Sequence, residues 1–267
     1  LAPSLLRSSN RNWPLLLVIL AFWCGDAVFA YAAASGQSVL ASTALRGSLG
    51  VVLILITIIG GRIIPAFTGN ALRARGAAVT MRSSRALEVA AIVSTAGYVL
   101  ADIAAPFGEL TGGIAAAAAL AHLIRLSGWH GLRSWRDPIV WILHAGYAWL
   151  PVGLALKAAF VLAGASWAVH WQHALGAGAA ATMIMAVMTR ASLGHTGRPL
   201  RVSRLVVVAY AALIASVFLR VFGAPVLQLQ YASTVTIAGA LWILAFALYS
   251  GAYAPILTRP RVDGKPG

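Results

Sequence analysis

Residues 173–199 read HALGAGAAATMIMAVMTRASLGHTGRP, and this stretch decides how the rest of the chain is interpreted. It begins as an apolar helix of small residues and methionines, and it is expected to leave that helix at Thr189-Arg190 for a polar loop that ends at Pro199. His173 stands inside the apolar part. Because imidazole nitrogens are costly in hydrocarbon without a partner, this histidine is expected to bind something.

The composition extends this membrane character to the whole chain. Hydrophobic residues make up 60% of the 267 residues and charged residues only 10%, whereas soluble domains carry about 25% charged residues. The chain is therefore expected to be a polytopic integral membrane protein. Its single cysteine, Cys24, allows no internal disulfide.

Eight apolar runs are long enough to cross a bilayer of about 30 Å. None alternates like a strand, and open sheets cannot stand in lipid. We therefore predict one all-α transmembrane domain over residues 1–267, a bundle of about eight helices. The predicted spans are 13–34, 48–65, 86–105, 110–127, 139–162, 166–189, 203–222 and 231–253.

The positive charges predict the orientation of these spans. With eight spans, seventeen of the twenty Lys and Arg residues fall on the side of residue 1, and only Arg46, Lys157 and Arg220 fall on the other. Positive residues collect on the cytoplasmic side, so both termini are predicted to be cytoplasmic, in a bacterial inner membrane. The net charge of +14 is then a topological signal that faces anionic lipid, and nucleic-acid binding is not expected.

The start of the chain allows a second interpretation. Arg7 and Arg11, an apolar run and then Ala30-Tyr31-Ala32 imitate a signal peptide. The apolar run is long for that purpose, so a true span is preferred.

The second span ends in the sequence GGRIIPAFTGNAL, residues 60–72. Pro65 and Gly69 are expected to break the helix at the cytoplasmic surface. Arg62 lies just inside that border, where it could reach the carboxylate of a cofactor or simply extend to the lipid surface.

These residues carry a resemblance to a known family. The chain resembles the NnrS family, bacterial inner-membrane proteins described as binding haem and copper and linked to the nitric oxide response and denitrification. The MTRxSLGHTGRP string is the most specific of the shared motifs. The motifs lie in order over roughly residues 50–200, at 61–65 (GRIIP), 144–151 (HAGYAWLP), 173–175 (HAL), 188–190 (MTR) and 192–199 (SLGHTGRP).

The resemblance implies haem and copper as cofactors, and nitric oxide or another small diatomic molecule as a ligand. Family members are longer, with about twelve predicted spans, so this chain resembles their C-terminal two-thirds. A histidine-bearing motif of the family's first spans has no counterpart here. No CxxCH pattern is present, so any haem b is expected to be bound noncovalently. Whether the protein turns over a substrate, and whether it associates with itself, is left open.

The histidines inside the spans are the candidate ligands. His144 and His122 are expected at similar depth on adjacent antiparallel helices, where they could ligate one haem iron from both faces. His173 lies nearer the outer border, with His170 one turn away. Neutral imidazole suits both iron and copper, and the resemblance favours His144 and His173. Each histidine could instead only hydrogen-bond a neighbouring helix.

Two further histidines, His130 and His195, fall in predicted cytoplasmic loops beside arginines. They are expected to be solvated surface residues, although His195 lies in a family motif. We predict that the loop of residues 194–198, together with Arg62 and Arg190, closes over a haem edge. Arg190 and Arg198 would bind the propionates, and His195 would donate a hydrogen bond or ligate copper.

Other polar and sulfur-containing residues in the spans are less specific. Met183, Met185 and Met188 point to different helix faces and cannot converge on one ion, so core or lipid-facing positions are favoured. Asp26 and Asp102 are expected in the outer half of the membrane, where they could relay protons, orient a ligand histidine or join helices.

Two function classes follow. The first is a haem- and copper-binding protein of the nitric oxide response. The second is a proton-coupled transporter or permease that uses the intramembrane histidines and acids. No motif for nucleotide hydrolysis, hydride transfer or zinc proteolysis is present.

Overall fold

The structure, a computed structural model, describes residues 14–82 and 84–264. The described residues form helices and no strands, and eight helical segments are long and apolar enough to cross a membrane. The all-α polytopic prediction is confirmed. Arg7, Arg11 and Lys265, on which the orientation of the termini partly rests, lie outside the described residues.

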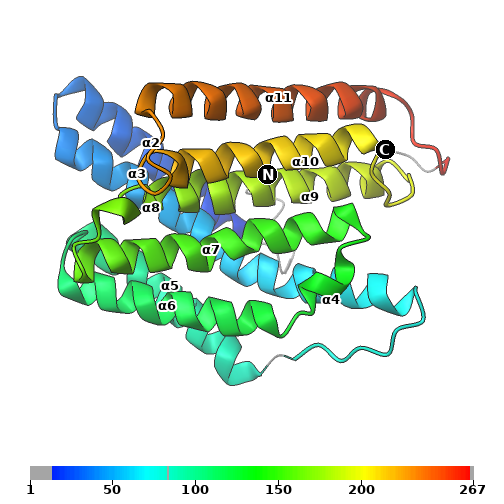
Figure 1. The fold of residues 1–267 in the computed structure, drawn as a ribbon, viewed down its shortest axis with the longest axis horizontal. Coiled ribbons are helices and arrows are strands. Elements are labelled where there is room, and N and C mark those ends of the chain that lie inside the picture. The colour runs from blue at the N-terminus through cyan, green and yellow to red at the C-terminus, as the bar shows by residue number, and fades with distance from the viewer. Residues whose placement is uncertain (1–13, 83, 265–267) are drawn as a thin grey trace.

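The eight spans follow one another as antiparallel neighbours (Figure 1). Short π-helical and 3-10 segments, labelled η, lie within them or, for η2, between two of them. The elements are α2 (Pro14–Ala34), α3 (Ser38–Leu55), η1 (Ile56–Gly60), α4 (Gly61–Arg73), α5 (Arg85–Ala104), α6 (Glu109–Ser127), η2 (Gly131–Ser134), α7 (Pro138–Leu162), η3 (Ser166–Ala168), α8 (Trp171–His173), η4 (Ala174–Ala181), α9 (Thr182–His195), α10 (Arg204–Phe218), η5 (Leu219–Gly223) and α11 (Tyr231–Thr258).

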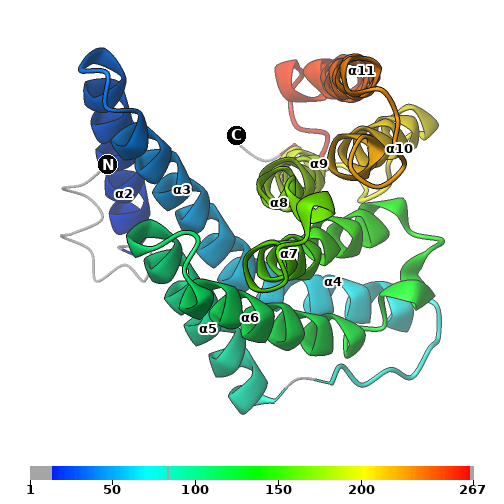
Figure 2. The same ribbon diagram turned by 60° about the vertical axis from the view of Figure 1, so that its left-hand side comes forward.

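The helix α7 is the centre of the bundle. More of its residues are buried than in any other described span, and α4, α6 and α9 pack around it. Figure 2 shows the α2–α3 hairpin diverging from the α10–α11 pair, with α5, α6 and α7 joining the two groups. Elements at the centre of the bundle are therefore the ones that can enclose a site.

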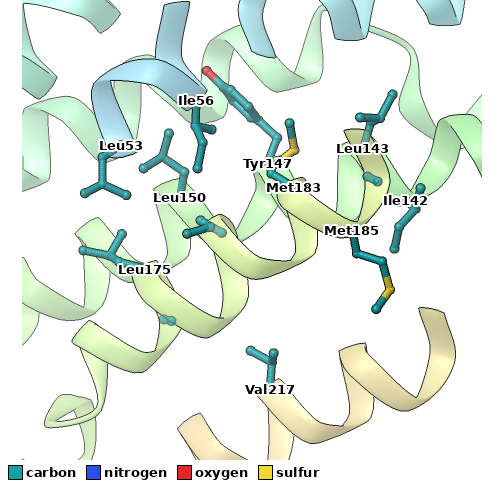
Figure 3. Close-up of a cluster of buried hydrophobic side chains, with 14 of the residues drawn as sticks. Leu53, Ile56, Ile142, Leu143, Tyr147, Leu150, Leu175, Met183, Met185 and Val217 are labelled. Atoms are coloured by element: carbon teal, nitrogen blue, oxygen red, sulfur yellow. The ribbon is translucent and has the colours of Figure 1, made fainter. Parts of the chain in front are cut away.

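Glycines let the helices around α7 approach closely. A Cβ on Gly146 would lie 3.1 Å from Met183, and one on Gly153 would lie 2.5 Å from the Leu175 side chain. Small residues commonly allow such backbone approach between membrane helices. Met183 and Met185 belong to this apolar core (Figure 3). Met188 is exposed, so the expectation of core or lipid-facing positions is confirmed.

Two predicted helix ends are wrong. Pro65 and Gly69 do not break the second span, because α4 continues through both to Arg73. The π-helical turn η1 stands directly before α4, and such a turn changes which carbonyl each amide reaches, so the helix can carry the proline. The second span is 36 residues long, about 54 Å at the α-helical rise, and extends beyond the bilayer.

The sixth span also runs further than predicted. It does not end at Thr189-Arg190 but continues to His195. The helix ends where Gly197 takes a left-handed conformation with φ 70°, and the Arg198 amide donates to the Leu193 carbonyl at 2.9 Å. A left-handed glycine just past the last turn is a common helix stop. Gly194 is itself helical, so Gly197 and not Gly194 ends the helix.

Candidate metal-binding sites

Four aromatic rings form a row at the arginine-rich end of the bundle. The ring centroids of His122 and Tyr147 lie 5.5 Å apart, those of Tyr147 and Trp129 lie 4.7 Å apart, and those of Trp129 and His144 lie 6.4 Å apart. The predicted neighbours His122 and His144 thus come from packed helices, α6 and α7. Two other side chains stand between them, so the two histidines do not face one another across an open space.

Hydrogen bonds occupy both ring nitrogens of His122. Tyr147 lies with its hydroxyl 2.7 Å from Nδ1, and Thr95 Oγ1 lies 2.8 Å from Nε2. The Thr95 hydroxyl donates to the Ala91 carbonyl at 2.7 Å, so Thr95 accepts from Nε2–H. Nδ1 therefore carries the lone pair, and the Tyr147 hydroxyl donates to it. With that lone pair engaged, His122 must lose a hydrogen bond before it can bind a metal.

Arg125 holds the Tyr147 hydroxyl from the other side. Its Nη1 donates to Tyr147 at 3.0 Å and to the Thr57 carbonyl of η1 at 2.7 Å. Its Nε donates to Glu88 Oε1 at 2.9 Å, and Nη2 donates to the other oxygen of the same carboxylate. Gly61 leaves room for this guanidinium, because any side chain there would overlap it. Arg125 thereby ties four spans together.

The hydrogen bonds leave His144 with a free lone pair. Its Nε2 lies 2.8 Å from Thr68 Oγ1, and the Thr68 hydroxyl donates to the Ile64 carbonyl at 2.8 Å. Thr68 therefore accepts from Nε2–H, which places the lone pair on Nδ1. That Nδ1 is buried and has no hydrogen-bond partner among the described residues. A ligand histidine typically has its second N–H fixed by an oxygen in this way.

A pocket of about 880 Å³ opens beside His144. Its volume lies within the range of about 300–1,000 Å³ that is usual for cofactor sites. Apolar side chains of α6 and α7 form most of the wall, and the loop between these helices adds polar groups. The lining residues are Leu123, Leu126, Ser127, His130, Gly131, Leu132, Arg133, Trp135, Trp141, His144, Ala145 and Ala148.

Gly131 allows the loop to lie against the His144 ring. A Cβ at position 131 would lie 2.5, 2.8 and 3.0 Å from Nδ1, Cγ and Cε1 of that ring. Because these three distances are nearly equal, the added Cβ would lie above the plane of the ring and not in line with the Nδ1 lone pair. Gly131 therefore covers one face of the imidazole and does not occupy the in-plane direction of the Nδ1 lone pair.

A second pair of histidines lies at the opposite end of the bundle. The ring centroids of His170 and His173 are 5.5 Å apart, and both side chains are partly exposed. His170 Nδ1 lies 3.4 Å from the Val221 carbonyl in η5, so Nδ1 carries the hydrogen and Nε2 the lone pair. The π-helix η4 begins directly after His173, and π-helical turns are frequent at functional sites.

The two histidine sites are separate. Gly146 and Gly153 of α7 face Met183 and Leu175, which puts His173 about a dozen residues along α7 from His144. At about 1.5 Å per residue this is roughly 17 Å. The two favoured ligands therefore belong to two sites.

The predicted arginine clamp does not meet at this pocket. Arg62, Arg190 and Arg198 are not among its lining residues. Arg190 stacks on Phe67 of α4, 3.6 Å from the ring centroid. The loop after α9 contacts the C-terminal segment, where the Val262 amide donates to the Thr196 carbonyl at 3.2 Å.

His195 is exposed on the last turn of α9. Among residues 14–82 and 84–264, no group of three or more His, Cys, Asp or Glu side chains gathers as for a metal ion. A metal in this protein would therefore rest on fewer protein ligands, or on a cofactor that brings its own.

Asp102 pairs with cations and not with a histidine. Its Oδ1 lies 2.8 Å from Lys157 Nζ, and its Oδ2 lies 3.7 Å from Arg46 Nε. The ammonium of Lys157 also lies 3.8 Å from the centre of the Trp171 ring. From the sequence, Lys157 and Arg46 were expected only to mark the topology, and their ion pairs with Asp102 show that they also join spans. Asp26 is exposed on α2.

Several residues of the sites were missed because no motif marks them. Tyr147 and Gly131 each take their role from a neighbour more than ten residues away in sequence, and Thr68 from one seventy-six residues away. Tyr147 falls inside the 144–151 string, one turn after His144. That spacing is the one signal that could have pointed to it.

Comparison with known proteins gives one match. The family model described as NnrS protein matches residues 1–261, nearly the whole chain and more than the 50–200 region that carries the motifs. No curated protein and no solved structure matches the chain. The chain belongs to the NnrS family.

Proposed function

We propose that this NnrS-family chain is a haem- and copper-binding protein of the bacterial inner membrane that takes part in the response to nitric oxide. The observation that carries the proposal is the buried, unpartnered Nδ1 of His144 beside a large pocket. A buried lone pair without a partner lowers stability, and a bound metal would remove that deficit. Neutral imidazole is the form that binds iron.

The pocket beside His144 suits haem b. Its walls are apolar, as a porphyrin face requires, and Arg133 at its mouth offers a planar donor pair for a propionate. In this proposal His144 is the haem ligand, Thr68 fixes its ring, and Arg133 replaces the arginines first expected to bind propionates. Bound haem would supply an iron centre for a diatomic ligand such as nitric oxide.

The His170–His173 pair is the proposed copper site. Two imidazoles 5.5 Å apart can approach one ion, and imidazole suits copper. His170 would bind through Nε2, because its Nδ1–H is directed at Val221. In this assignment His173 binds copper and not iron.

The orientation follows from the positive charges. We propose that the end of the bundle with Arg125 and the α9–α10 loop is cytoplasmic, because the arginines concentrate there. The haem pocket then lies in the cytoplasmic half of the membrane and the copper pair near the periplasmic surface.

A proton-coupled transporter is the second candidate. The buried Asp102–Lys157 pair favours it, with Arg46 beside Asp102, because ionisable groups inside a membrane often serve transport. The two candidates differ in whether a cofactor is needed at all.

An absorption spectrum of the purified protein tests the first proposal. A haem protein shows a Soret band, and His144→Ala should lose or shift it while His173→Ala should lose copper and keep the band. A folded, colourless protein that does not take up added haemin would reject the haem proposal and leave the transporter.

A further inference from the structure

A second histidine lines the pocket beside His144. His130 stands on the loop between α6 and η2, directly before Gly131, and both residues border the pocket. The sequence placed His130 among solvated surface residues, because arginines follow it closely. Its side chain is instead partly buried at the pocket.

The backbone of His130 is held in a conformation that favours glycine. Its φ and ψ are 53° and 34°, in the left-handed region. Only one other described residue besides the glycines, Gln228, has a positive φ. The left-handed conformation is less favourable for a residue with a Cβ than for glycine, although histidine adopts it more often than most residues, and such conformations cluster at functional sites. Glycine would fit position 130 without strain, so the imidazole itself needs an explanation.

The hydrogen bonds of His130 match those of His144. His130 Nε2 lies 3.2 Å from the Thr80 carbonyl, and because a carbonyl can only accept, Nε2 carries the hydrogen. Its Nδ1 then holds the lone pair and has no partner among the described residues. Both histidines therefore keep one N–H fixed by an oxygen and one nitrogen available, which is the usual arrangement of metal-ligating histidines.

The loop that carries His130 is fixed to its surroundings. The Arg82 amide donates to the Gly128 carbonyl at 3.2 Å, and the Trp129 amide donates to Leu126 at 3.1 Å. Trp129 is buried completely. The hydrogen bond at Gly128 and the burial of Trp129 therefore hold the backbone beside His130 in place at the pocket.

From these observations we infer that His130 is the second protein ligand of the metal that His144 binds in this pocket. The inference rests on the proposed function for the ligand role of His144, and it adds a residue that neither the motifs nor the family match assigns. The metal is the iron of haem or a copper ion, because neutral imidazole suits both. Two nitrogen ligands on haem iron give a six-coordinate centre, so a diatomic ligand such as nitric oxide would bind by displacing His130.

The test uses His130→Gly in the full-length protein. Glycine relieves the left-handed conformation, so the fold should be kept while the ligand is lost. The matched control is Gln228→Gly, which relieves the only other such conformation, in the loop between η5 and α11. Wild type, both variants and His144→Ala are purified, and each is loaded with haemin and, separately, with Cu(II).

In the haem arm, the spectrum of the oxidised wild type should be that of six-coordinate low-spin iron. The His130→Gly variant should show a high-spin spectrum with haem still bound, and added imidazole should restore the low-spin spectrum. The control Gln228→Gly should have the wild-type spectrum.

In the copper arm, electron paramagnetic resonance should show one nitrogen ligand fewer on the copper of His130→Gly than on that of wild type. The arm that shows the effect identifies the metal.

The experiment distinguishes a failure of the proposed function from a failure of the inference about His130. If His144→Ala keeps the wild-type spectra in both arms, the proposed function fails at its first ligand. If His144→Ala changes them and His130→Gly has the same spin state, reduction potential and copper signal as wild type, His130 is not a ligand and the inference is overturned.

Discussion

Replacing Arg125 by methionine removes the ion that joins four spans. The guanidinium is 1% exposed, whereas its partner Glu88 is 29% exposed. Methionine fills a similar length but leaves the Thr57 carbonyl and one side of the Tyr147 hydroxyl without their donor. Removing one partner of a buried ion pair costs about 3–5 kcal/mol. Because water can reach the Glu88 carboxylate, we expect about 3 kcal/mol of lost stability, near the lower limit.

The exposed pair Arg75–Asp137 supplies the matched control. Its two side chains are 37% and 27% exposed and join at 2.6 Å, and exposed pairs contribute about 0.2–1 kcal/mol. The free energies of unfolding of Arg125→Met and Arg75→Met are measured by titration with a denaturing detergent in mixed micelles, followed by helix circular dichroism. Equal losses of unfolding free energy in the two variants would refute the reasoning that burial and additional hydrogen bonds make Arg125 the more stabilising residue.

Three further predictions concern other parts of the fold. Asp102→Leu should destabilise the protein more than Lys157→Met, because it leaves the buried Lys157 and the partly buried Arg46 without their carboxylate partner; equal losses of stability in the same detergent titration would argue against this. Gly131→Ala should lower metal occupancy without changing helix content, because a Cβ there would lie 2.5 Å from His144 Nδ1; unchanged metal content by elemental and haem analysis would contradict it. Reporter fusions placed in four connections between spans should all read periplasmic, namely 35–37, 105–108, 163–165 and 224–230. Two or more cytoplasmic readings would overturn the orientation.

The spans could be predicted because the membrane enforces them. The third span was predicted as 86–105 and is Arg85–Ala104, since the polar residues Ser84 and Arg85 mark its start and Pro106 follows its end. Ser84 caps its first turn by accepting from the Leu87 amide at 3.2 Å. The second span was predicted eighteen residues too short, because neither its start at Ser38 nor its end at Arg73 coincides with the ends of the apolar run.

The candidate sites were harder to predict than the spans. The three π-helical segments leave no signature in the spacing of apolar residues, since all faces of these helices are apolar. The difference between His122 and His144 depends on where two threonine hydroxyls donate, to Ala91 and to Ile64. A sequence shows that both histidines are buried. It does not show which lone pair is used.

The position of His130 illustrates the same limit. Its neighbours in sequence are those of a solvated loop, and only the contacts of that loop with Thr80 and Arg82 place it at the pocket. Such contacts arise between segments about fifty residues apart, and local patterns do not encode them.

The most direct test of the central claim compares two buried histidines by haem content. His144→Ala and His122→Asn are expressed with haem supply, and the haem-to-protein ratio of each is measured against wild type by the pyridine haemochrome assay. The free lone pair of His144 and the engaged lone pair of His122 predict that His144→Ala loses haem and that His122→Asn retains it. Full haem content in His144→Ala, with loss in His122→Asn, would contradict the account.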